Sequence, residues 1–321
     1  MKIFKKLFGN RAASKGVVGI SFLAEGFAIA VANYTNSNKP HLIYCEFLRL
    51  FDADSIVSSL ERLSTQFKLS DYECHLILVA SDYRRINIET PVVANDELND
   101  AIRWKIADLI DYPINNALMD FYPAPVPVRS SDRKFCDVIV SPKLAIEQQT
   151  TLCSGADLNM KVIDIQETCL RNLAALLPEN KRGVAILHLQ ETVGTILVQR
   201  DATIYLSRTL DIGYSKLSLQ DTYDGYTEQI QEHNNLTLEI QRSLDYVENY
   251  YGLPPISCLA VIPIALNTQA LLNILNSTPG ITARIMDIST IVDCDVILDD
   301  ATQCFCAPVI GTTLRYALKL E

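Results

Sequence analysis

Long apolar runs are the first feature that this 321-residue sequence lacks. Its uncharged apolar stretches fall far short of the roughly 20 residues that a transmembrane helix needs. The N-terminal residues 1–15 are basic, but they contain no apolar core of about 7–15 residues and no cleavage site, so they do not form a secretory signal. With 49% hydrophobic and 21% charged residues, the chain has a globular composition. We expect a cytoplasmic protein of two domains.

Metal-binding motifs are also absent. The four histidines make no HxxxH or HExxH pattern, and the nine cysteines are scattered without a CxxC pair. Cys304 and Cys306 lack the second ligand pair that a zinc site needs. Most cysteines lie inside apolar runs, which indicates reduced core thiols. The aspartates 293, 295, 299 and 300 cluster without a glycine-containing calcium loop, which favours a solvated turn. We expect no metal and no cofactor.

Catalytic motifs are equally scarce, because the sequence contains neither GxSxG nor GxxxxGK[ST]. The net charge is −10, and the five basic residues of 1–15 leave 23 basic and 38 acidic groups in the remainder. This excess of negative charge would repel the phosphate backbone and argues against a nucleic-acid partner. The sequence therefore predicts neither an enzyme nor a nucleic-acid-binding protein.

The sequence does contain a repeated β-hairpin. Residues 16–33 form an apolar run, a short turn near Ala24–Gly26 and a second apolar run. The pattern returns without a gap 167 residues later, at 183–200, with identical residues at four matched positions. Further strand-like runs follow each hairpin, at 41–50 and 202–210. A hairpin that recurs at a domain-sized interval indicates two related halves.

The segment between the hairpins predicts a small inserted unit. The order β-α-β-β-α over 82–152 interrupts the first half, which resumes at a strand over 160–165 and a helix over 167–177. We therefore predict a basic tail at 1–15, a first half at 16–81 and 160–181, an insert at 82–159, and a second half at 182–321. The other expected elements are helices at 54–68, 96–111, 143–152 (capped by Ser141), 227–251 (broken near 233–234), 268–276 and 312–320, and strands at 74–80, 83–89, 117–122, 135–140, 259–262 and 282–286.

The helix expected at 96–111 has a surplus aromatic residue. Its apolar stripe spans about 120° and consists of Leu98, Ile102, Ile106, Leu109 and Ile110. Trp104, the only tryptophan in the chain, lies roughly opposite this stripe. It therefore needs a second surface, which is either the parent domain or a partner.

Several runs resemble the PilM family of type IV pilus assembly proteins. They are 99–114 (NDAIRWKIADLIDYPI), 119–122 (MDFY), 166–173 (QETCLRNL) and 239–247 (EIQRSLDYV). The resemblance covers nearly the whole chain from Gly16 and is most specific at 99–122 and 239–247. It implies an α/β fold of the actin-like type (actin, Hsp70, hexokinase). This fold has two duplicated halves, with a small α/β subdomain inserted in the first.

The resemblance also marks a departure from actin-like ATPases. Those proteins hold nucleotide phosphates in the two hairpin turns through an Asp-x-Gly pattern, in which the acid positions the metal shell and glycine lets backbone N–H groups close on phosphate. The corresponding tripeptides here are Ser21-Phe22-Leu23 and His188-Leu189-Gln190, and the adenosine loop is Pro263-Ile264-Ala265-Leu266-Asn267.

None of these elements keeps its acid or glycine, and within the family they look most like the MshI type, from the mannose-sensitive haemagglutinin (MSHA) pilus. Each lost charged hydrogen bond costs roughly 1.5–3 kcal/mol, enough together to weaken a micromolar site beyond about 1 mM. We expect no nucleotide. The alternative is a compensating site built from Ser21, Glu25, Glu191, Thr192 and Thr195.

Family membership implies a partner as well. PilM binds the cytoplasmic N-terminal tail of a bitopic inner-membrane protein of PilN type, in a groove beside the insert. We predict that Arg84, Arg85, Arg103 and Trp104 contribute to this site, although exposed arginines on a strand often only protect an edge. Other pilus assembly proteins are expected partners. The rival interpretations are an active actin-like ATPase that regulates pilus assembly and a cytoskeletal filament protein.

The basic tail suggests a location at the inner membrane. At helical spacing Ile3, Phe4, Leu7 and Phe8 gather on one side, with lysines around the rest. Residues 1–14 could thereby add weak peripheral contact with an anionic inner leaflet. The alternative is a frayed tail, because one or two helical turns are marginal alone.

Overall fold

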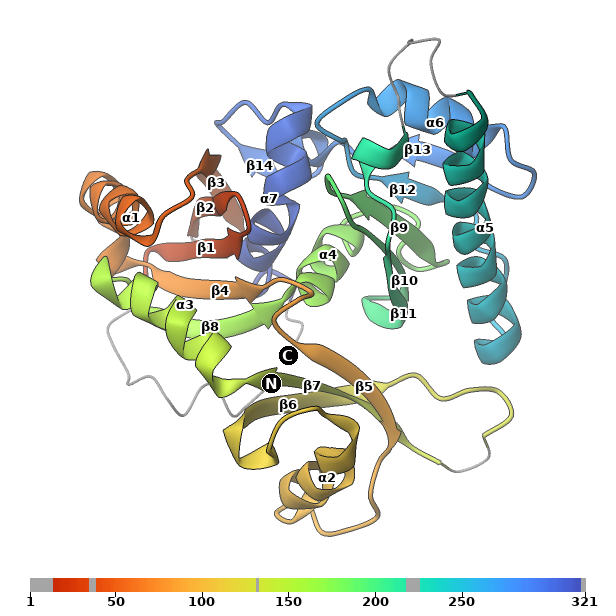
Figure 1. Ribbon diagram of the computed structural model, residues 1–321, viewed down its shortest axis with the longest axis horizontal. Coiled ribbons are helices and arrows are strands. Elements are labelled where there is room, and N and C mark those ends of the chain that lie inside the picture. The colour runs from red at the N-terminus through yellow and green to blue at the C-terminus, as the bar shows by residue number, and fades with distance from the viewer. Residues whose placement is uncertain (1–13, 35–38, 131–132, 218–225, 319–321) are drawn as a thin grey trace.

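The computed structural model describes residues 14–34, 39–130, 133–217 and 226–318. All of the tail 1–14 except Ser14 therefore lies outside the described residues. Three β-sheets organise the chain (Figure 1). Two large sheets stand side by side, and a small sheet lies at one end of the molecule, below the first large sheet.

The first large sheet has six strands in the order β14-β3-β2-β1-β4-β8. Helices α1 (Ala53–Phe67) and α3 (Lys143–Gly155) cover its outer face, where Leu60, Leu63, Ile146 and Cys153 are buried. Asp52 caps α1 by accepting a 2.8 Å hydrogen bond from the Ser55 N–H. The strands are β1 (Gly16–Leu23), β2 (Gly26–Tyr34), β3 (Pro40–Arg49), β4 (Glu73–Leu78), β8 (Met160–Ile165) and β14 (Asp293–Cys294).

The second large sheet has five strands in the order β11-β10-β9-β12-β13. Helices α5 (Tyr226–Tyr251) and α6 (Thr268–Asn276) cover its outer face through residues such as Leu236, Ile240, Leu271 and Leu275. The predicted break of α5 near 233–234 is absent. The strands are β9 (Val184–Leu189), β10 (Gly194–Arg200), β11 (Thr203–Leu210), β12 (Leu259–Val261) and β13 (Ala283–Ile285).

The two large sheets are copies of one topology, which confirms the duplication. Each has an antiparallel meander of three strands whose first strand pairs in parallel with a fourth, and the fourth with a fifth. The register is also repeated. Val18 pairs with Val31 in the first hairpin, and Ala185 pairs with Val198 in the second, each 167 residues further on.

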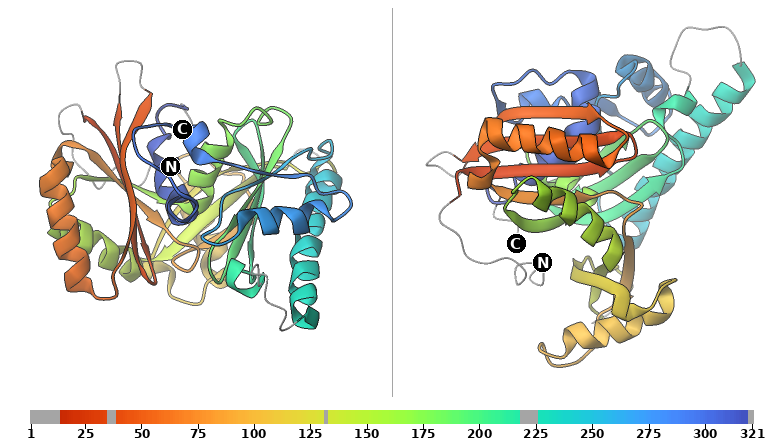
Figure 2. Two further views of the ribbon diagram at one scale, coloured as in Figure 1. Left: turned by 90° about the horizontal axis from the view of Figure 1, so that it is seen from above. Right: turned by 60° about the vertical axis from the view of Figure 1, so that its left-hand side comes forward.

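Helices α4 (Gln166–Ala174) and α7 (Asp300–Thr313) lie between the two large sheets (Figure 2, left). Their buried residues join side chains of both sheets in one core. Gly311 allows the two helices to cross closely, because a Cβ there would lie 2.2 Å from the Cys169 carbonyl oxygen. The Asn172 amide fixes the crossing by donating a 3.0 Å hydrogen bond to the Gly311 carbonyl oxygen.

The small sheet is the insert, with strand order β5-β7-β6. Its strands are β5 (Arg84–Glu89), β6 (Ala117–Ala124) and β7 (Phe135–Pro142), and helix α2 (Leu98–Ile106) packs on it through the fully buried Ile102 and Ile106. Helix α2 ends five residues before the predicted end, where a 3₁₀ turn follows. The 3₁₀ turns of the chain are Leu69–Asp71, Ala107–Leu109, Ile114–Asn116, Tyr214–Leu217 and Ile288–Thr290.

The insert is smaller than predicted. The range 82–159 includes α3, but Ile146 and Cys153 of this helix lie in the core of the first large sheet and not in that of the insert. The insert therefore ends with β7. Ser141 does not cap α3 either, because it lies in β7 and its hydroxyl donates a 2.7 Å hydrogen bond to the Asp82 carbonyl oxygen.

The C-terminal segment also differs from the prediction. The closing helix was expected at 312–320, whereas α7 occupies Asp300–Thr313. Almost all of its side chains are buried, so it has no polar face and shows no helical period, and Pro308 stands inside it. The aspartate cluster at 293–300, expected to be a solvated turn, is partly in contact with the first half. His41 contacts Asp293 (3.0 Å) and Asp295 (2.8 Å) where β14 pairs with β3.

Candidate partner-binding site

The insert sheet has one covered face and one polar face. Successive residues of a strand point to opposite faces, and the residues of one parity pack against α2 as a closed apolar core. The alternate residues of the same strands point to the second face. They are Arg85 and Asn87 of β5, Asp137 of β7, and Asp120 and Tyr122 of β6. Asn87 and Tyr122 are both register partners of Asp137, so they form one row across the sheet.

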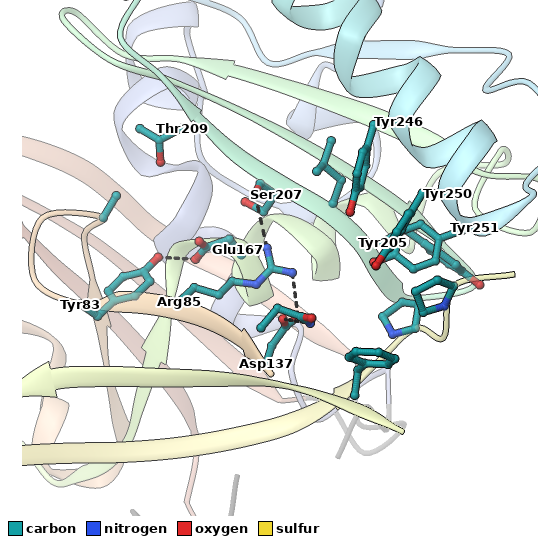
Figure 3. A pocket seen from close by; sticks show the side chains of 16 residues that line it. Tyr83, Arg85, Asp137, Glu167, Tyr205, Ser207, Thr209, Tyr246, Tyr250 and Tyr251 are labelled. Atoms are coloured by element: carbon teal, nitrogen blue, oxygen red, sulfur yellow. Dashed lines mark hydrogen bonds and ion pairs between the residues drawn. The ribbon is translucent and has the colours of Figure 1, made fainter. Parts of the chain in front are cut away.

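This polar face borders a cavity of about 380 Å³, which we call the insert groove (Figure 3). The insert strands form one wall, and β11 and α5 of the second half form the other. Glu167 at the start of α4 contributes to the floor. A cavity of this size is within the range of small-ligand and peptide-anchor sites.

Arg85 connects the two walls. Its Nη2 lies 2.7 Å from Asp137 Oδ2, and its Nη1 donates a 3.5 Å hydrogen bond to the Ser207 carbonyl oxygen of β11 (Figure 3). Asn87 donates a 2.8 Å hydrogen bond to the second oxygen of Asp137. The ion pair is well shielded, with 17% of the Arg85 side chain and 1% of the Asp137 side chain exposed. Arg85 Nε is buried and has no hydrogen-bond partner in the part of the chain that the structure describes, so these residues leave one donor of the groove unused.

The floor of the groove holds a buried acid. The Tyr83 hydroxyl donates a hydrogen bond to Glu167 Oε2 (Figure 3). Burial raises the pKa of the Glu167 carboxyl, and the hydrogen bond from Tyr83 opposes this shift. Burial also raises the pKa of Tyr83, so its hydroxyl stays protonated and remains the donor.

A tyrosine cluster forms the far wall. Tyr205 of β11 and Tyr251 of α5 meet edge to face at 5.2 Å, and Tyr246 and Tyr250 stack at 4.9 Å. Tyr246 and Tyr250 remain 39% and 42% exposed. The Val128 N–H donates a 3.1 Å hydrogen bond to the Tyr250 carbonyl oxygen, which ties the insert to α5. Exposed tyrosines combine an apolar ring with a polar tip and suit the recognition of a peptide.

Two unused polar groups lie further along the same face of the sheet. Among the described residues, the Tyr122 hydroxyl and Asp120 Oδ2 are both buried without a hydrogen-bond partner. Burial raises the pKa of Tyr122, and Arg85 and Arg171 act against this shift. Asp120 borders a separate cavity of about 20 Å³ against the first half, and burial raises the pKa of its carboxyl.

Of the four predicted partner-binding residues, only Arg85 lies in the groove. Arg84 points to the opposite face and pairs with Asp111 at 3.0 Å. Arg103 donates a 2.9 Å hydrogen bond to the Ile114 carbonyl oxygen. Trp104 is 78% exposed, so it does not attach the insert to its parent domain. The structure does not bring these three residues together with Arg85.

Sequence reasoning missed most of the groove, although two signals were present. Asp137 is a lone charge inside the apolar run 135–140, which is costly to bury without a partner. Tyr246 and Tyr250 are four residues apart in the expected helix and therefore share a side of α5. Glu167 gave no signal, because its role depends on where α4 begins.

The residues at the former phosphate loops are engaged in internal contacts. The Ser21 hydroxyl donates a 3.0 Å hydrogen bond to the Ile77 carbonyl oxygen. His188 is buried, which lowers its pKa, and its Nε2 lies 2.7 Å from the Cys304 carbonyl oxygen. Leu23 and Gln190 border a second cavity between the two hairpin turns.

The adenosine-loop positions Pro263 and Ala265 hold no glycine, and Ala265 packs against the hydrophobic core. The residues at the former phosphate loops carry neither the acid nor the glycine of the Asp-x-Gly pattern.

Two further searches of the described residues gave negative results. Within 14–34, 39–130, 133–217 and 226–318, no three His, Cys, Asp or Glu side chains are grouped as metal ligands would be. Over the same residues, no helix combines the length and apolar character required to cross a bilayer.

Comparison with known proteins adds a family match. A family model described as type IV pilus assembly protein PilM matches residues 48–248. A search of curated protein sequences gave no match.

Solved structures are also similar to this chain. The PilM–PilN type IV pilus biogenesis complex matches over 94% of this chain and 98% of that chain, with 15% identity and a TM-score of 0.73. A Bacteroides thetaiotaomicron protein with an actin-like ATPase fold and unknown function matches over 89% and 94%, with 9% identity and a TM-score of 0.49.

The cytoplasmic domain of EpsL, an inner-membrane component of the Vibrio cholerae type II secretion system, matches over 82% and 94%, with 14% identity and a TM-score of 0.46. The first match, together with the duplicated topology, confirms the predicted actin-like fold class.

Proposed function

The chain belongs to the PilM family of type IV pilus assembly proteins, and from this membership we propose that it is a scaffold that binds the cytoplasmic tail of a PilN-type inner-membrane protein. The binding site is the insert groove. The observation that carries the proposal is the polar face of the insert sheet, which stays open to a 380 Å³ cavity while the opposite face is closed by α2. A sheet face left open in this way is available to a partner.

The chemistry of the groove suits a short extended peptide. Arg85 offers its unused Nε–H to a carbonyl oxygen of the peptide. The exposed rings of Tyr246 and Tyr250 offer apolar contact area, which anchors a peptide in such grooves. The PilM homologue of known structure forms a complex with PilN, which supports this class of partner.

The proposed scaffold is not an enzyme. Both turn positions that hold acids in actin-like ATPases carry Ser21 and His188 here, and both side chains are used internally. Loss of these groups favours a degenerate nucleotide site and, within the family, the MshI type that serves MSHA pili. We place the protein in the cytoplasm at the inner membrane, with other pilus assembly proteins as further partners. The alternative is an active ATPase whose nucleotide state regulates assembly.

Titration calorimetry with the tail peptide of the PilN-type protein tests the proposal. Asn87→Arg places a long cationic side chain in the groove, and Tyr246→Ala removes an exposed aromatic ring from its far wall. We expect each to weaken binding at least about tenfold, which corresponds to about 1.4 kcal/mol. Trp104→Ala, on the outer face of the insert, is the matched control and should bind as the wild type does.

The outcomes separate the two faces of the insert. Unchanged affinity in both groove variants, with melting temperatures close to that of the wild type, would reject the groove. Loss of binding in Trp104→Ala alone would instead move the site to the outer face of α2.

A further inference from the structure

Trp104 lies on the outer face of α2, on the side of the helix that points away from the insert sheet. The residue is 78% exposed, whereas Ile102 and Ile106 of the same helix are fully buried in the core of the insert. Aromatic side chains bury about 150–250 Å² when they are covered, so a partner that covers Trp104 gains a large contact area. An exposed tryptophan is therefore a suitable anchor for a partner.

Carboxylates surround this indole. Asp100 lies one helical turn before Trp104 on the same side of α2, Glu97 directly precedes the helix, and Asp108 follows in the 3₁₀ turn that continues it. All three acids are exposed. Within the described residues, none of the three side chains makes an ion pair or a hydrogen bond. We call Trp104 and these three acids the tryptophan face.

The two basic residues of α2 leave the centre of this face acidic. Arg103 and Lys105 stand next to Trp104 in the chain, so each points about 100° to one side of it. The Arg103 guanidinium donates a 2.9 Å hydrogen bond to the Ile114 carbonyl oxygen. Lys105 Nζ donates a 2.7 Å hydrogen bond to the Glu89 carbonyl oxygen. Both cations are therefore held at the borders of the tryptophan face by backbone contacts.

The combination of an indole and carboxylates selects the chemistry of the partner. An arginine guanidinium stacks on an aromatic ring and also pairs with a carboxylate through two parallel hydrogen bonds. A membrane surface attracts exposed tryptophans too, but an anionic leaflet repels the carboxylates. A second copy of this chain is disfavoured as well, because beyond residue 15 it carries 38 acidic and 23 basic groups.

We propose that the tryptophan face binds a basic segment of a partner protein. An arginine of this segment stacks on Trp104 and pairs with Asp100 or Asp108, and further basic residues of the segment balance the remaining carboxylate charge. Because α2 covers the face of the insert sheet opposite to the insert groove (Figure 1), both sites can be occupied at once. The proposal does not depend on tail binding at the groove.

The indole reports directly on its own site, because Trp104 is the only tryptophan in the chain. Tetra-arginine amide, titrated into the full chain, should give a saturable change in the tryptophan emission. Tetra-lysine amide should bind at least about threefold more weakly, since an ammonium group has neither the planar stacking surface nor the paired donors of a guanidinium. A tetra-glutamate peptide should not bind.

Variants of the tryptophan face are measured by calorimetry with tetra-arginine amide. The double change Asp100→Asn and Asp108→Asn should weaken binding at least about threefold, as expected for two exposed ion pairs. Trp104→Ala should weaken it about two- to fivefold, the usual effect of an exposed cation–π contact. The charge-matched control is Glu61→Gln with Glu147→Gln, which removes two exposed acids from α1 and α3 and should leave the affinity unchanged.

Four results would overturn the proposal. The first is an emission that does not change at millimolar tetra-arginine amide, and the second is an equal loss of affinity in the control pair, which would mean attraction by net charge alone. The third is a blue shift of the emission on phosphatidylserine vesicles without any response to tetra-arginine amide, which would make the occupant a membrane. The fourth is a concentration-dependent dimer that Trp104→Ala abolishes, which would make the occupant a second copy.

Titration of the tail peptide of the PilN-type protein keeps this proposal apart from the proposed function. The tail peptide should bind the Asp100→Asn, Asp108→Asn variant as it binds the wild type, and it should not displace tetra-arginine amide. A failure at the tryptophan face therefore does not count against the groove.

Discussion

Gln166 and Glu167 are consecutive residues at the start of α4, yet their side chains enter different cavities. Gln166 borders the second cavity, between the two hairpin turns, and Glu167 borders the insert groove. Ala80 and Thr209 border both cavities. The first turn of α4 is therefore a common wall, and a displacement of this turn by a ligand in one cavity would change the shape of the other.

Glu167→Gln should make the protein more stable, and increasingly so as the pH rises. Because burial raises the pKa of Glu167 above its ordinary value of 4.5, the folded protein binds this proton more tightly than the unfolded chain does. The contribution of the Glu167 carboxyl to the free energy of unfolding therefore falls as the pH rises above 4.5. Urea unfolding at a series of pH values from about pH 5 to about pH 8 should show the free energy of unfolding of the variant increasing relative to that of the wild type as the pH rises.

The exposed acid Glu147 provides the control for this comparison. Glu147→Gln removes a carboxylate from the surface of α3 and controls for the loss of one negative charge. A constant difference between Glu167→Gln and the wild type would show that the buried acid is not titrating in this range.

Trp104→Ala should leave the stability nearly unchanged. The indole is 78% exposed, and surface substitutions of this kind usually change the free energy of unfolding by less than about 0.5 kcal/mol. Ile102→Ala, on the buried side of the same helix, should cost about 2–5 kcal/mol. Urea denaturation of both variants measures the contrast. A large loss for Trp104→Ala would mean that the indole packs against the rest of the chain after all.

Magnesium-ATP should not raise the melting temperature. A ligand present at 100 times its dissociation constant would add about 2.7 kcal/mol of stability, which a thermal scan detects readily. We expect no shift at millimolar nucleotide, whereas the tail peptide should give one and so serves as the positive control. A rise with nucleotide would favour the alternative ATPase interpretation.

The sequence predicted the elements whose pattern is local. The hairpins of β1–β2 and β9–β10 could be recognised because two apolar runs and the turn residues between them lie within a few positions of each other. The apolar stripe of α2 could likewise be read from its period. In contrast, α7 was missed because it is buried on nearly all sides, so its apolar residues carry no period, and because it contains Pro308.

The sites were harder to predict because they depend on contacts between distant segments. Arg85 pairs with a residue 52 positions away in the chain and also reaches Ser207, 122 positions away. The strand pattern around Arg84 and Arg85 showed that they face opposite ways, yet not which of them faces the groove. The predicted C-terminal boundary of the insert was wrong for the same reason, since only the tertiary packing assigns α3 to the first half.

Gly311→Ala should disrupt the contact between α4 and α7. The added Cβ would lie 2.2 Å from the Cys169 carbonyl oxygen, and neither backbone can retreat without disturbing the core between the two sheets. We expect a loss of at least about 1–3 kcal/mol, the usual cost of overpacking a core. Gly155→Ala is the matched control, because its Cβ would meet only Val57 at 3.6 Å. That change should be neutral or stabilise by up to about 1 kcal/mol. Urea denaturation of the two variants gives the comparison, and equal stabilities would show that α4 and α7 do not depend on this close approach.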